Sequence, residues 1–420
     1  MEYKVSQKVK DTFEALSSLE SVKKGLEAIK KDQDRCINEQ IELTLIEAPT
    51  FHEEKRAEAM KKKMEELGLE DVHIDRGGNV VGVRKGSGGG KRVLIEGHLD
   101  TVFPMGSVKK VEEKNGFLYA PGIGDDTRAL AMLLSCIRGL DTAGIKTKGD
   151  LVFVATTREE GMGSLGGMKD FLDDNYENLD ASISIDGGDI ADITYEATGF
   201  KTYEVNFYGI GGHAYGAFGK MANPLHAAAR AVAKIADFEV SENPRTTFCV
   251  SNFHAGNDAG VHAIVPKATI KFNFRSNSKE LLEELDGRIF KAIGEACDEE
   301  TARWGKDTIT WDMKQYCDVP AGTQDVHSPM VESTYAVLES LGVKGNFSAG
   351  GSTNCNMAID RGIPAVCIGR GYYPEGTDKD NKVHNLGEKY PVEGAYLGVQ
   401  QLMLTALMCA GIEGVDSVLE

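Results

Sequence analysis

Residues 93–104 read VLIEGHLDTVFP and place two metal-binding residue types directly after an apolar run. The run VLI predicts a buried strand, which His98 and Asp100 follow. Open α/β sheets place ligands at the carboxyl ends of their strands, so both side chains are expected in a functional crevice. Alternate residues of an extended segment point the same way, which lets Asp100 hold the imidazole of His98. Taken alone, a His-x-Asp pattern is more often structural than metal-binding.

Four further segments carry acidic or histidine side chains after an apolar run. They are Asp125 in APGIGDDTRA, Glu159 and Glu160 in VFVATTREEG, Asp186 in ISIDGGD and His384 in NKVHNLGEKY. Each segment also has an ordinary explanation, such as a helix cap, a solvated loop or a surface histidine. Two histidines and several carboxylates without a cysteine are nevertheless the ligand set of a hydrolytic metal centre. Because all the ordinary explanations would have to hold together, the sequence favours a metal-dependent enzyme.

The acidic residues suit different roles in such a centre. Beside His98, Asp125 is a candidate for bridging two metal ions. Glu159 and Glu160 would repel each other at a buried strand end unless a cation or a proton lay between them. Since neighbouring side chains diverge, the pair favours one ligand and one general base.

The alternation of strands and helices predicts an α/β sheet covered by helices on both faces. A helix is expected over residues 127–141, and apolar positions at helical spacing predict one or two helices over residues 6–46. The glycines of GSGGG, residues 86–90, are expected to form a hairpin-like loop. Four strands are expected near residues 93–96, 151–155, 181–185 and 364–368.

The pattern changes between about residues 199 and 315, where four strand-like segments accompany two helical ones. This change predicts an α+β domain inserted at 199–315. The catalytic domain would then comprise residues 1–198 and 316–420, with residues 1–40 as a helical extension.

The composition excludes several classes of protein. The 420 residues include 47 Lys and Arg against 65 Asp and Glu, a net charge of −18 that the phosphates of nucleic acid would repel. The eight cysteines show no CxxC spacing, which indicates reduced thiols in a cytosolic protein. A polar amino-terminal segment gives no secretory signal, and no apolar run reaches the roughly 20 residues of a membrane span. We therefore expect a cytoplasmic protein without nucleic-acid or membrane partners.

Nine motifs resemble, in family order, those of the dinuclear zinc exopeptidase and deacylase family. The family includes peptidase T, acetylornithine deacetylase, succinyl-diaminopimelate desuccinylase and the bacterial glutamate carboxypeptidases; the chain is most similar to its tripeptidase-like members. The resemblance covers about residues 40–410 and implies a zinc-exopeptidase-like mixed sheet with an inserted lid and dimerisation domain. The motifs are GHLDTVFP, GIGDDTRA, EEGMGSLGG, IDGG, GIGGHAYG, NFRS, GGSTN, GIPAVCIGRG and VHNLGE.

The resemblance implies two Zn²⁺ ions per subunit, which Co²⁺ or Mn²⁺ could replace. It assigns His98 and Asp186 to one ion, Glu160 and His384 to the other, and Asp125 to both.

It also implies catalytic roles beside the ligands. Glu159 corresponds to the general base and Asp100 to the partner of His98, and the peptide bond between Asp125 and Asp126 is expected to be cis.

The inserted domain is implied to carry substrate-binding residues. His213 would reach the active site of a partner subunit, and Arg275 would bind a substrate carboxylate. Relatives usually have Asn in place of His262, Asp in place of Asn273 and Asp in place of Asn354. We expect these three departures to lie in substrate-facing or lid segments and to alter specificity.

These inferences predict metal-dependent hydrolysis of amide bonds in short peptides, as in a dipeptidase, tripeptidase or aminopeptidase. A water activated by two zinc ions would attack the amide, and the protein would form a homodimer through its lid domain. The alternative is a deacylase of N-acyl amino acids with the same mechanism. A non-catalytic scaffold is disfavoured because neither a metal ligand nor the base is missing.

Overall fold

The computed structural model describes residues 3–304, 309–348, 350–374 and 383–420. The chain forms two compact units. The first comprises Met1–Ala197 and Thr323–Glu420, and the second comprises Thr198–Gly322. The boundary that the sequence placed at residue 315 falls inside the strand Thr310–Val319, which continues the antiparallel sheet of the second unit.

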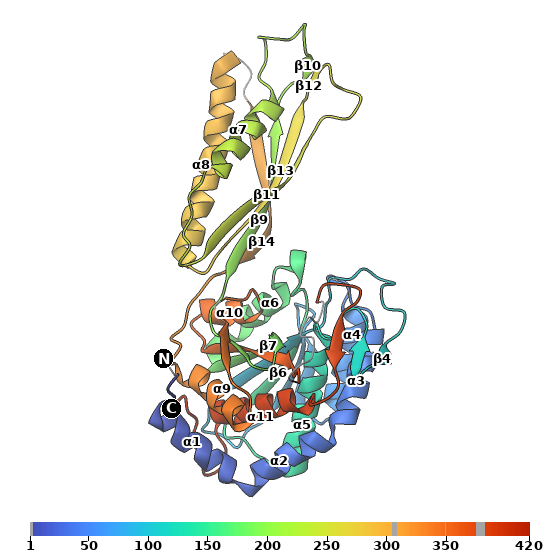
Figure 1. The fold of residues 1–420 in the computed structure, drawn as a ribbon, viewed down its shortest axis with the longest axis vertical. Helices are drawn as coiled ribbons and strands as arrows, with labels where there is room; N and C mark the ends of the chain where they lie inside the picture. The colour runs from blue at the N-terminus through green and yellow to red at the C-terminus, as the bar shows by residue number, and fades with distance from the viewer. Residues whose placement is uncertain (1–2, 305–308, 349, 375–382) are drawn as a thin grey trace. The chain divides into compact units, whose positions relative to one another are not determined.

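An eight-stranded mixed sheet forms the centre of the first unit (Figure 1). The neighbouring strands β6, β3, β7 and β16 run parallel, so their carboxyl ends lie along one edge of the sheet. In spatial order the strands are β1 (Glu70–Ile74), β2 (Val80–Arg84), β6 (Leu151–Thr156), β3 (Val93–His98), β7 (Ala181–Asp189), β16 (Ala365–Gly371), β8 (Asp192–Thr194) and β15 (Asn346–Ser348). A small separate sheet contains β4 (Glu112–Lys114), β5 (Phe117–Tyr119) and β17 (Lys389–Pro391).

Helices cover both faces of this sheet, which confirms the predicted α/β class (Figure 1). One face carries α5 (Thr127–Ala143), α9 (Pro329–Ser340) and α11 (Tyr396–Ala410). The other carries α6 (Gly166–Asn175) and α10 (Cys355–Asp360), while α4 (Glu54–Glu66) packs against β1 and β2. Two short 3₁₀ turns occupy Gly161–Gly163 and Tyr176–Asn178.

The amino-terminal region forms three helices where the sequence predicted one or two. They are α1 (Gln7–Ser18), α2 (Glu20–Lys31) and α3 (Gln33–Leu45). Extended backbone at Leu19 separates the first two, and Asp32 joins the second to the third. Neither junction contains glycine or proline, so the residues that usually mark a helix end give no signal there.

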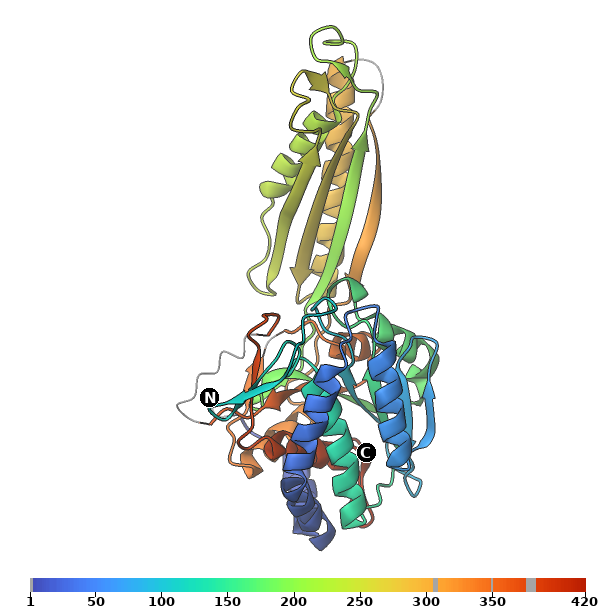
Figure 2. The ribbon, with the colours of Figure 1, turned by 90° about the vertical axis from the view of Figure 1, so that its right-hand side faces the viewer.

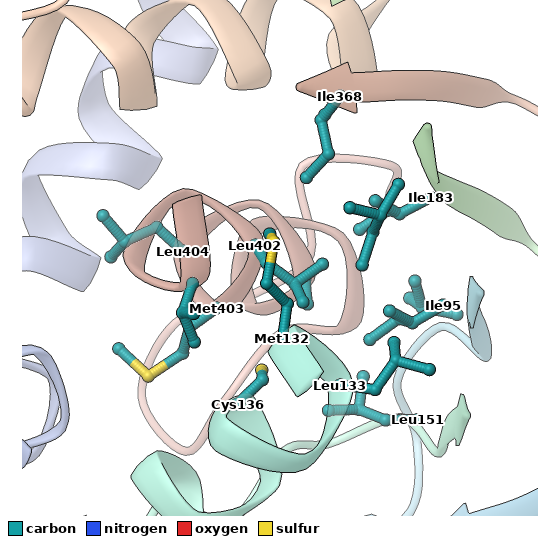
Figure 3. Packing of buried hydrophobic residues seen from close by; sticks show 14 of the residues in the cluster. Ile95, Met132, Leu133, Cys136, Leu151, Ile183, Ile368, Leu402, Met403 and Leu404 are labelled. Carbon is teal, nitrogen blue, oxygen red and sulfur yellow. The ribbon is translucent and has the colours of Figure 1, made fainter. Parts of the chain in front are cut away.

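The core between α5, α11 and the sheet is built from fully buried aliphatic side chains (Figure 3). Met132 and Leu133 of α5 and Leu402 of α11 pack with Ile95 of β3 and Ile183 of β7. Burial of each such side chain is worth about 1.5–3 kcal/mol. The parallel strands are therefore held firmly against the two helices, and their carboxyl ends occupy defined positions.

The loop GSGGG does not form the expected hairpin. It joins β2 to β3, but β6 lies between these strands and pairs with both. The loop instead crosses the segment before β6. A Cβ atom on Gly86 would lie 2.3 Å from the Lys148 carbonyl oxygen, and one on Gly90 would lie 2.3 Å from the Gly149 nitrogen. Close backbone contact explains these glycines.

The second unit is a four-stranded antiparallel sheet with two helices on one of its faces, as the sequence predicted (Figure 2). In spatial order the strands are β11 (Thr246–Ala255), β13 (Lys267–Ser276), β9 (Gly199–Tyr208) and β14 (Thr310–Val319). The helices are α7 (Pro224–Ala236) and α8 (Lys279–Trp304). A short ribbon of β10 (Gly212–His213) and β12 (Ala263–Ile264) extends from this sheet.

Two expectations from composition can be compared with the structure. None of the eight cysteines forms a disulfide, and all but Cys249 are buried. Among the described residues, no helix has both the length and the apolar character needed to cross a bilayer.

Glycine lets α2 approach α5 closely, which leads to a stability prediction. A Cβ atom on Gly139 of α5 would lie 2.5 Å from Cγ1 of Ile29. We expect Gly139→Val to lower the free energy of unfolding by about 1–3 kcal/mol through overpacking, measured by urea denaturation. Gly287→Ala in α8 is the control, because a Cβ atom there meets no atom within 4 Å and should raise stability by about 0.5–1 kcal/mol. Unchanged stability of the Gly139 variant would contradict the close packing.

Candidate active site

The predicted ligands converge because the strands that carry them are neighbours. His98 ends β3, Asp186 lies in β7, and Glu159 and Glu160 follow β6. Asp125 precedes α5, which packs against β3. The carboxyl edge of the parallel strands thus collects residues from four separate segments, where open α/β sheets place their ligands.

Five of these residues form the predicted pattern of two overlapping groups. His98, Asp125 and Asp186 offer one set of donor atoms, and Asp125, Glu160 and His384 offer another, each within 4.8 Å of one another. Nε2 of His98 is 3.1 Å from Oδ1 of Asp125. Nε2 of His384 is 3.2 Å from Oδ2 of Asp125 and 3.0 Å from Oε1 of Glu160. Asp125 therefore turns one carboxylate oxygen toward each histidine, as a bridging ligand would.

The backbone around these ligands has two unusual features. The peptide bond between Asp125 and Asp126 is cis, as the family resemblance implied. His384 has a φ of 60°, and Arg158, which precedes the two glutamates, has a φ of 52°. Residues other than glycine seldom adopt this left-handed conformation, and those that do cluster at functional sites.

Asp100 organises the site more broadly than the sequence indicated. Nδ1 of His98 lies 2.9 Å from the backbone carbonyl of Asp100 and 3.6 Å from its carboxylate. The carboxylate also accepts hydrogen bonds from the backbone N–H groups of Glu159 and Glu160, each at 3.0 Å, and from the Thr50 hydroxyl at 2.9 Å. One buried side chain thus holds the loop that carries both glutamates beside His98.

The electrostatics of the site favour the binding of cations. Burial raises the pKa of Glu159 well above its usual value, and Asp186 raises it further. Burial also raises the pKa of Glu160, with a further increase from Asp125. Hydrogen bonds to Asp125 and Glu160 raise the pKa of His384 to about 10. Buried carboxylates of like charge need a counter-ion.

The donor set fits divalent metal ions. Nitrogen from two histidines and oxygen from several carboxylates suits zinc and the neighbouring first-row ions, and cysteine is absent from the described groups. The donor atoms of these residues are therefore chemically suited to a dinuclear metal centre.

Two charged residues at the site were missed in the sequence. Arg370, at the carboxyl end of β16, lies with Nη1 3.2 Å from Asp125 and 3.4 Å from Asp126, and it hydrogen bonds to Asp186. Asp126 accepts a hydrogen bond of 2.8 Å from the backbone N–H of His98. The strand–glycine–charge pattern in PAVCIGRG could have identified Arg370, since it repeats the pattern of the other ligand segments.

Glu388 is a third missed residue. Its Oε1 accepts backbone hydrogen bonds from Gly124 and Asp125, each at 2.8 Å, and its Oε2 accepts one from Gly122 at 3.0 Å. The side chain is fully buried, and burial raises its pKa to about 7. Glu388 therefore joins the segment that carries His384 to the loop that carries Asp125.

Asn354 lies elsewhere than expected. The sequence placed it in a substrate-facing segment, but only 2% of the residue is exposed. Its amide donates hydrogen bonds of 2.8 Å to Glu96 and to Thr156, on β3 and at the end of β6. Asn354 thus belongs to a buried network on the strands that carry the ligands.

The remaining predicted residues lie in the second unit. His213 and His262 occupy adjacent segments, since β10 pairs with β12 and the backbone N–H of Ala214 donates to the carbonyl of His262. Arg275 lies at the other end of the sheet, 4.7 Å above the ring of Phe200, and donates a hydrogen bond of 3.3 Å to Asn273. The structure therefore brings the two histidines together and leaves Arg275 apart from them.

Comparisons with known proteins agree with this geometry. Residues 94–407 match the Peptidase family M20/M25/M40, and the chain belongs to this family. A succinyl-diaminopimelate desuccinylase of Burkholderia ambifaria is 30% identical over 269 residues, which cover 58% of this chain and 69% of that protein.

Solved structures share the fold. Aminopeptidase PepT of Bacillus cereus is 24% identical with a TM-score of 0.72, covering 89% of this chain and 99% of that one. A tripeptidase of Staphylococcus aureus is 23% identical with a TM-score of 0.75, covering 90% and 98%. The resemblance inferred from the motifs is confirmed, and the chain is a hydrolase of peptide or amide bonds.

The contacts of Glu388 lead to a prediction about the metal centre. Glu388→Gln replaces one acceptor oxygen with a donor that faces backbone N–H groups, so it should displace the Asp125 loop. We expect about tenfold weaker metal affinity, measured by competition with a chromophoric chelator. We also expect the free energy of unfolding to fall by about 1.5–3 kcal/mol. Glu393→Gln, in the same segment but exposed, should change neither quantity. Equal metal affinity in the two variants would show that Glu388 does not position the loop.

Proposed function

We propose that the protein is a zinc-dependent exopeptidase that hydrolyses short peptides. The observation that carries this proposal is the position of Asp125 between two histidines. Its two carboxylate oxygens lie 3.1 Å from Nε2 of His98 and 3.2 Å from Nε2 of His384. A single carboxylate between two nitrogen donors matches the requirement of a dinuclear centre, in which one ligand is shared.

Each ion has its own ligands in the proposal. His98 and Asp186 would hold one Zn²⁺ and Glu160 and His384 the other, with Asp125 between them. Bound there, two divalent ions would acidify a water molecule and polarise the scissile carbonyl. Co²⁺ or Mn²⁺ fits the same nitrogen and oxygen donors.

Glu159 supplies the general base. Asp100 fixes the backbone of Glu159 through a hydrogen bond, and burial raises the pKa of Glu159, which suits a group that accepts a proton. In the reaction, Glu159 takes a proton from the attacking water as the new C–O bond forms. It then gives the proton to the departing amine as the C–N bond breaks.

His213 is suited to donating a hydrogen bond to the developing oxyanion. Its Nδ1 accepts hydrogen bonds of 3.2 Å from the backbone N–H groups of Tyr215 and Gly216. The neutral ring then carries its proton on Nε2, which is left to donate. A fixed donor of this kind stabilises the transition state of acyl transfer.

The surface around His213 supports a homodimer through the second unit. Tyr215 is 90% exposed and Phe218 is 70% exposed, and the nearby Ile210 and Val261 are also exposed. Exposed apolar clusters are typical of protein interfaces. We place His213 in the active site of the partner subunit, where it would complete the site.

Arg275 is suited to binding the carboxylate of a substrate. Its contacts with the Phe200 ring and the Asn273 amide are with uncharged groups, which place no negative charge against the guanidinium. A guanidinium binds a carboxylate through paired hydrogen bonds. His262, beside His213 in the same ribbon, is proposed as a further substrate contact.

The second candidate function is deacylation of N-acyl amino acids. Its support is the similarity to the succinyl-diaminopimelate desuccinylase of Burkholderia ambifaria. The same ligands and base serve both reactions.

Removal of the base tests the proposed mechanism. Glu159→Ala should lower kcat by about 10²–10⁴-fold, because proton transfer loses its acceptor, while bound zinc stays near the wild-type content. Metal analysis and steady-state assays measure the two effects. Glu160→Ala is the matched control and should lose metal as well as activity. Full turnover by the Glu159 variant would exclude this residue as the base.

A substrate panel extends the same assay to the choice between the two functions. It pairs dipeptides and tripeptides with N-succinyl and N-acetyl amino acids, each with a free or an amidated terminal carboxyl group. A peptidase hydrolyses the peptides and prefers free carboxylates. Preference for the N-acyl amino acids would establish the deacylase instead.

Mixed dimers test the placement of His213. The Glu159→Ala and His213→Ala proteins are unfolded together and refolded as a mixture. If His213 serves the partner subunit, each mixed dimer contains one complete site, and activity should recover to about a quarter of the wild-type value. Each variant refolded alone is the control. Size-exclusion chromatography shows whether the refolded mixture is dimeric. If it is dimeric and activity does not recover, His213 serves its own subunit or lies outside the site.

A further inference from the structure

A buried hydrogen-bond network lies on the strands that carry the ligands. It is centred on Glu96 of β3, which is 1% exposed. Oε1 of Glu96 accepts a hydrogen bond from the Ser184 hydroxyl of β7. Oε2 accepts one of 2.8 Å from the Asn354 amide and one of 3.3 Å from the Thr156 hydroxyl of β6. One carboxylate thus joins three adjacent strands.

Each strand in the network continues into a proposed ligand or the base. Glu96 lies two residues before His98 on β3, and Ser184 lies two residues before Asp186 on β7. Alternate residues of a strand point to the same face, so the network and these two ligands share one face of the sheet. Thr156 ends β6, directly before the loop that carries Glu159. Any relative shift of the strand ends would change the distances among the ligands and also break this network.

Asn354 is the fourth residue of the network. It lies at the start of α10 and donates 2.8 Å hydrogen bonds to both Glu96 and Thr156. An amide donor facing a buried carboxylate satisfies it without a second charge. An aspartate at this position would set two carboxylates against each other. Glu96 and Asn354 therefore form a matched pair in this chain.

We propose that Glu96, Ser184 and Asn354 are positioning residues of the metal centre. They touch neither the ions nor the substrate. The Glu96 carboxylate instead holds the ends of β3, β6 and β7 in one arrangement, and this arrangement sets the spacing of His98 and Asp186. The inference rests on the proposed function, because it concerns the geometry of the proposed metal site.

A pair of serines on β7 gives a matched comparison. Ser184 donates to Glu96, whereas Ser182, two residues earlier and equally buried, has a hydroxyl without a hydrogen-bond partner among the described residues. Both Ser→Ala changes remove one buried oxygen from the same face of the same strand. Ser184→Ala should weaken metal affinity several-fold and lower kcat with little change in KM, whereas Ser182→Ala should change neither.

A swap of the amide and the carboxylate tests the pairing directly. Asn354→Asp places two carboxylates together, and we expect about tenfold weaker metal affinity and a changed absorption spectrum of the Co²⁺-loaded protein. Adding Glu96→Gln restores one amide facing one carboxylate, so the double variant should recover most of the affinity and the wild-type spectrum. A structural role in stability alone would move the unfolding midpoint without moving the spectrum.

The experiment separates failure of this inference from failure of the proposed function. Metal content and peptide hydrolysis of the wild-type protein are measured first, and a wild-type protein that binds no metal would overturn both. If the wild type binds metal, equal affinities and spectra for the Asn354→Asp and wild-type proteins overturn the positioning role. If Asn354→Asp does not fold, the comparison of Ser184→Ala with Ser182→Ala decides, and equal metal affinity there overturns it.

Discussion

Repulsion among buried carboxylates governs the architecture of the first unit. Asp125, Asp126, Glu159 and Glu160 are all less than one-tenth exposed and lie at the same edge of one sheet. Holding like charges in such a place costs free energy that hydrogen bonds, cations or protonation can offset. Arg370 supplies one cation within the protein itself, next to two of these carboxylates. Backbone N–H groups directed at the neighbouring carboxylates of Asp100 and Glu388 hold the surrounding loops in place.

Two neutral amides illustrate the same electrostatic constraint in different settings. Asn354 donates a hydrogen bond to a buried carboxylate without adding a second charge. Asn273 accepts a hydrogen bond from Arg275 without adding a negative charge beside it. The same residue type therefore satisfies a buried carboxylate in one place and contacts an exposed guanidinium in the other.

The sequence predicted the parts of this protein that depend on local pattern. The buried strands, the helix that begins at Thr127 and the ligand-bearing strand ends each follow from residues that lie next to one another. The missed residues depend on distant contacts: Arg370 meets Asp125 across 245 positions and Glu388 meets it across 263. Likewise, the burial of Asn354 follows from its contact with Glu96, 258 positions away. Residue type alone does not reveal such pairs, because the two partners come together only in the folded structure.

The distance along the chain between Asp125 and Glu388 has a consequence for how the protein is made. The Asp125 loop donates three backbone hydrogen bonds to the carboxylate of Glu388, which the ribosome adds 263 residues after Asp125. His384 belongs to the same late segment, and α11, which completes the core against α5, follows it. A nascent chain therefore carries most of the proposed ligands before it carries the segment that orders them. In the proposed centre one ion would need His384, so both ion sites would be complete only after this segment has been synthesised and folded.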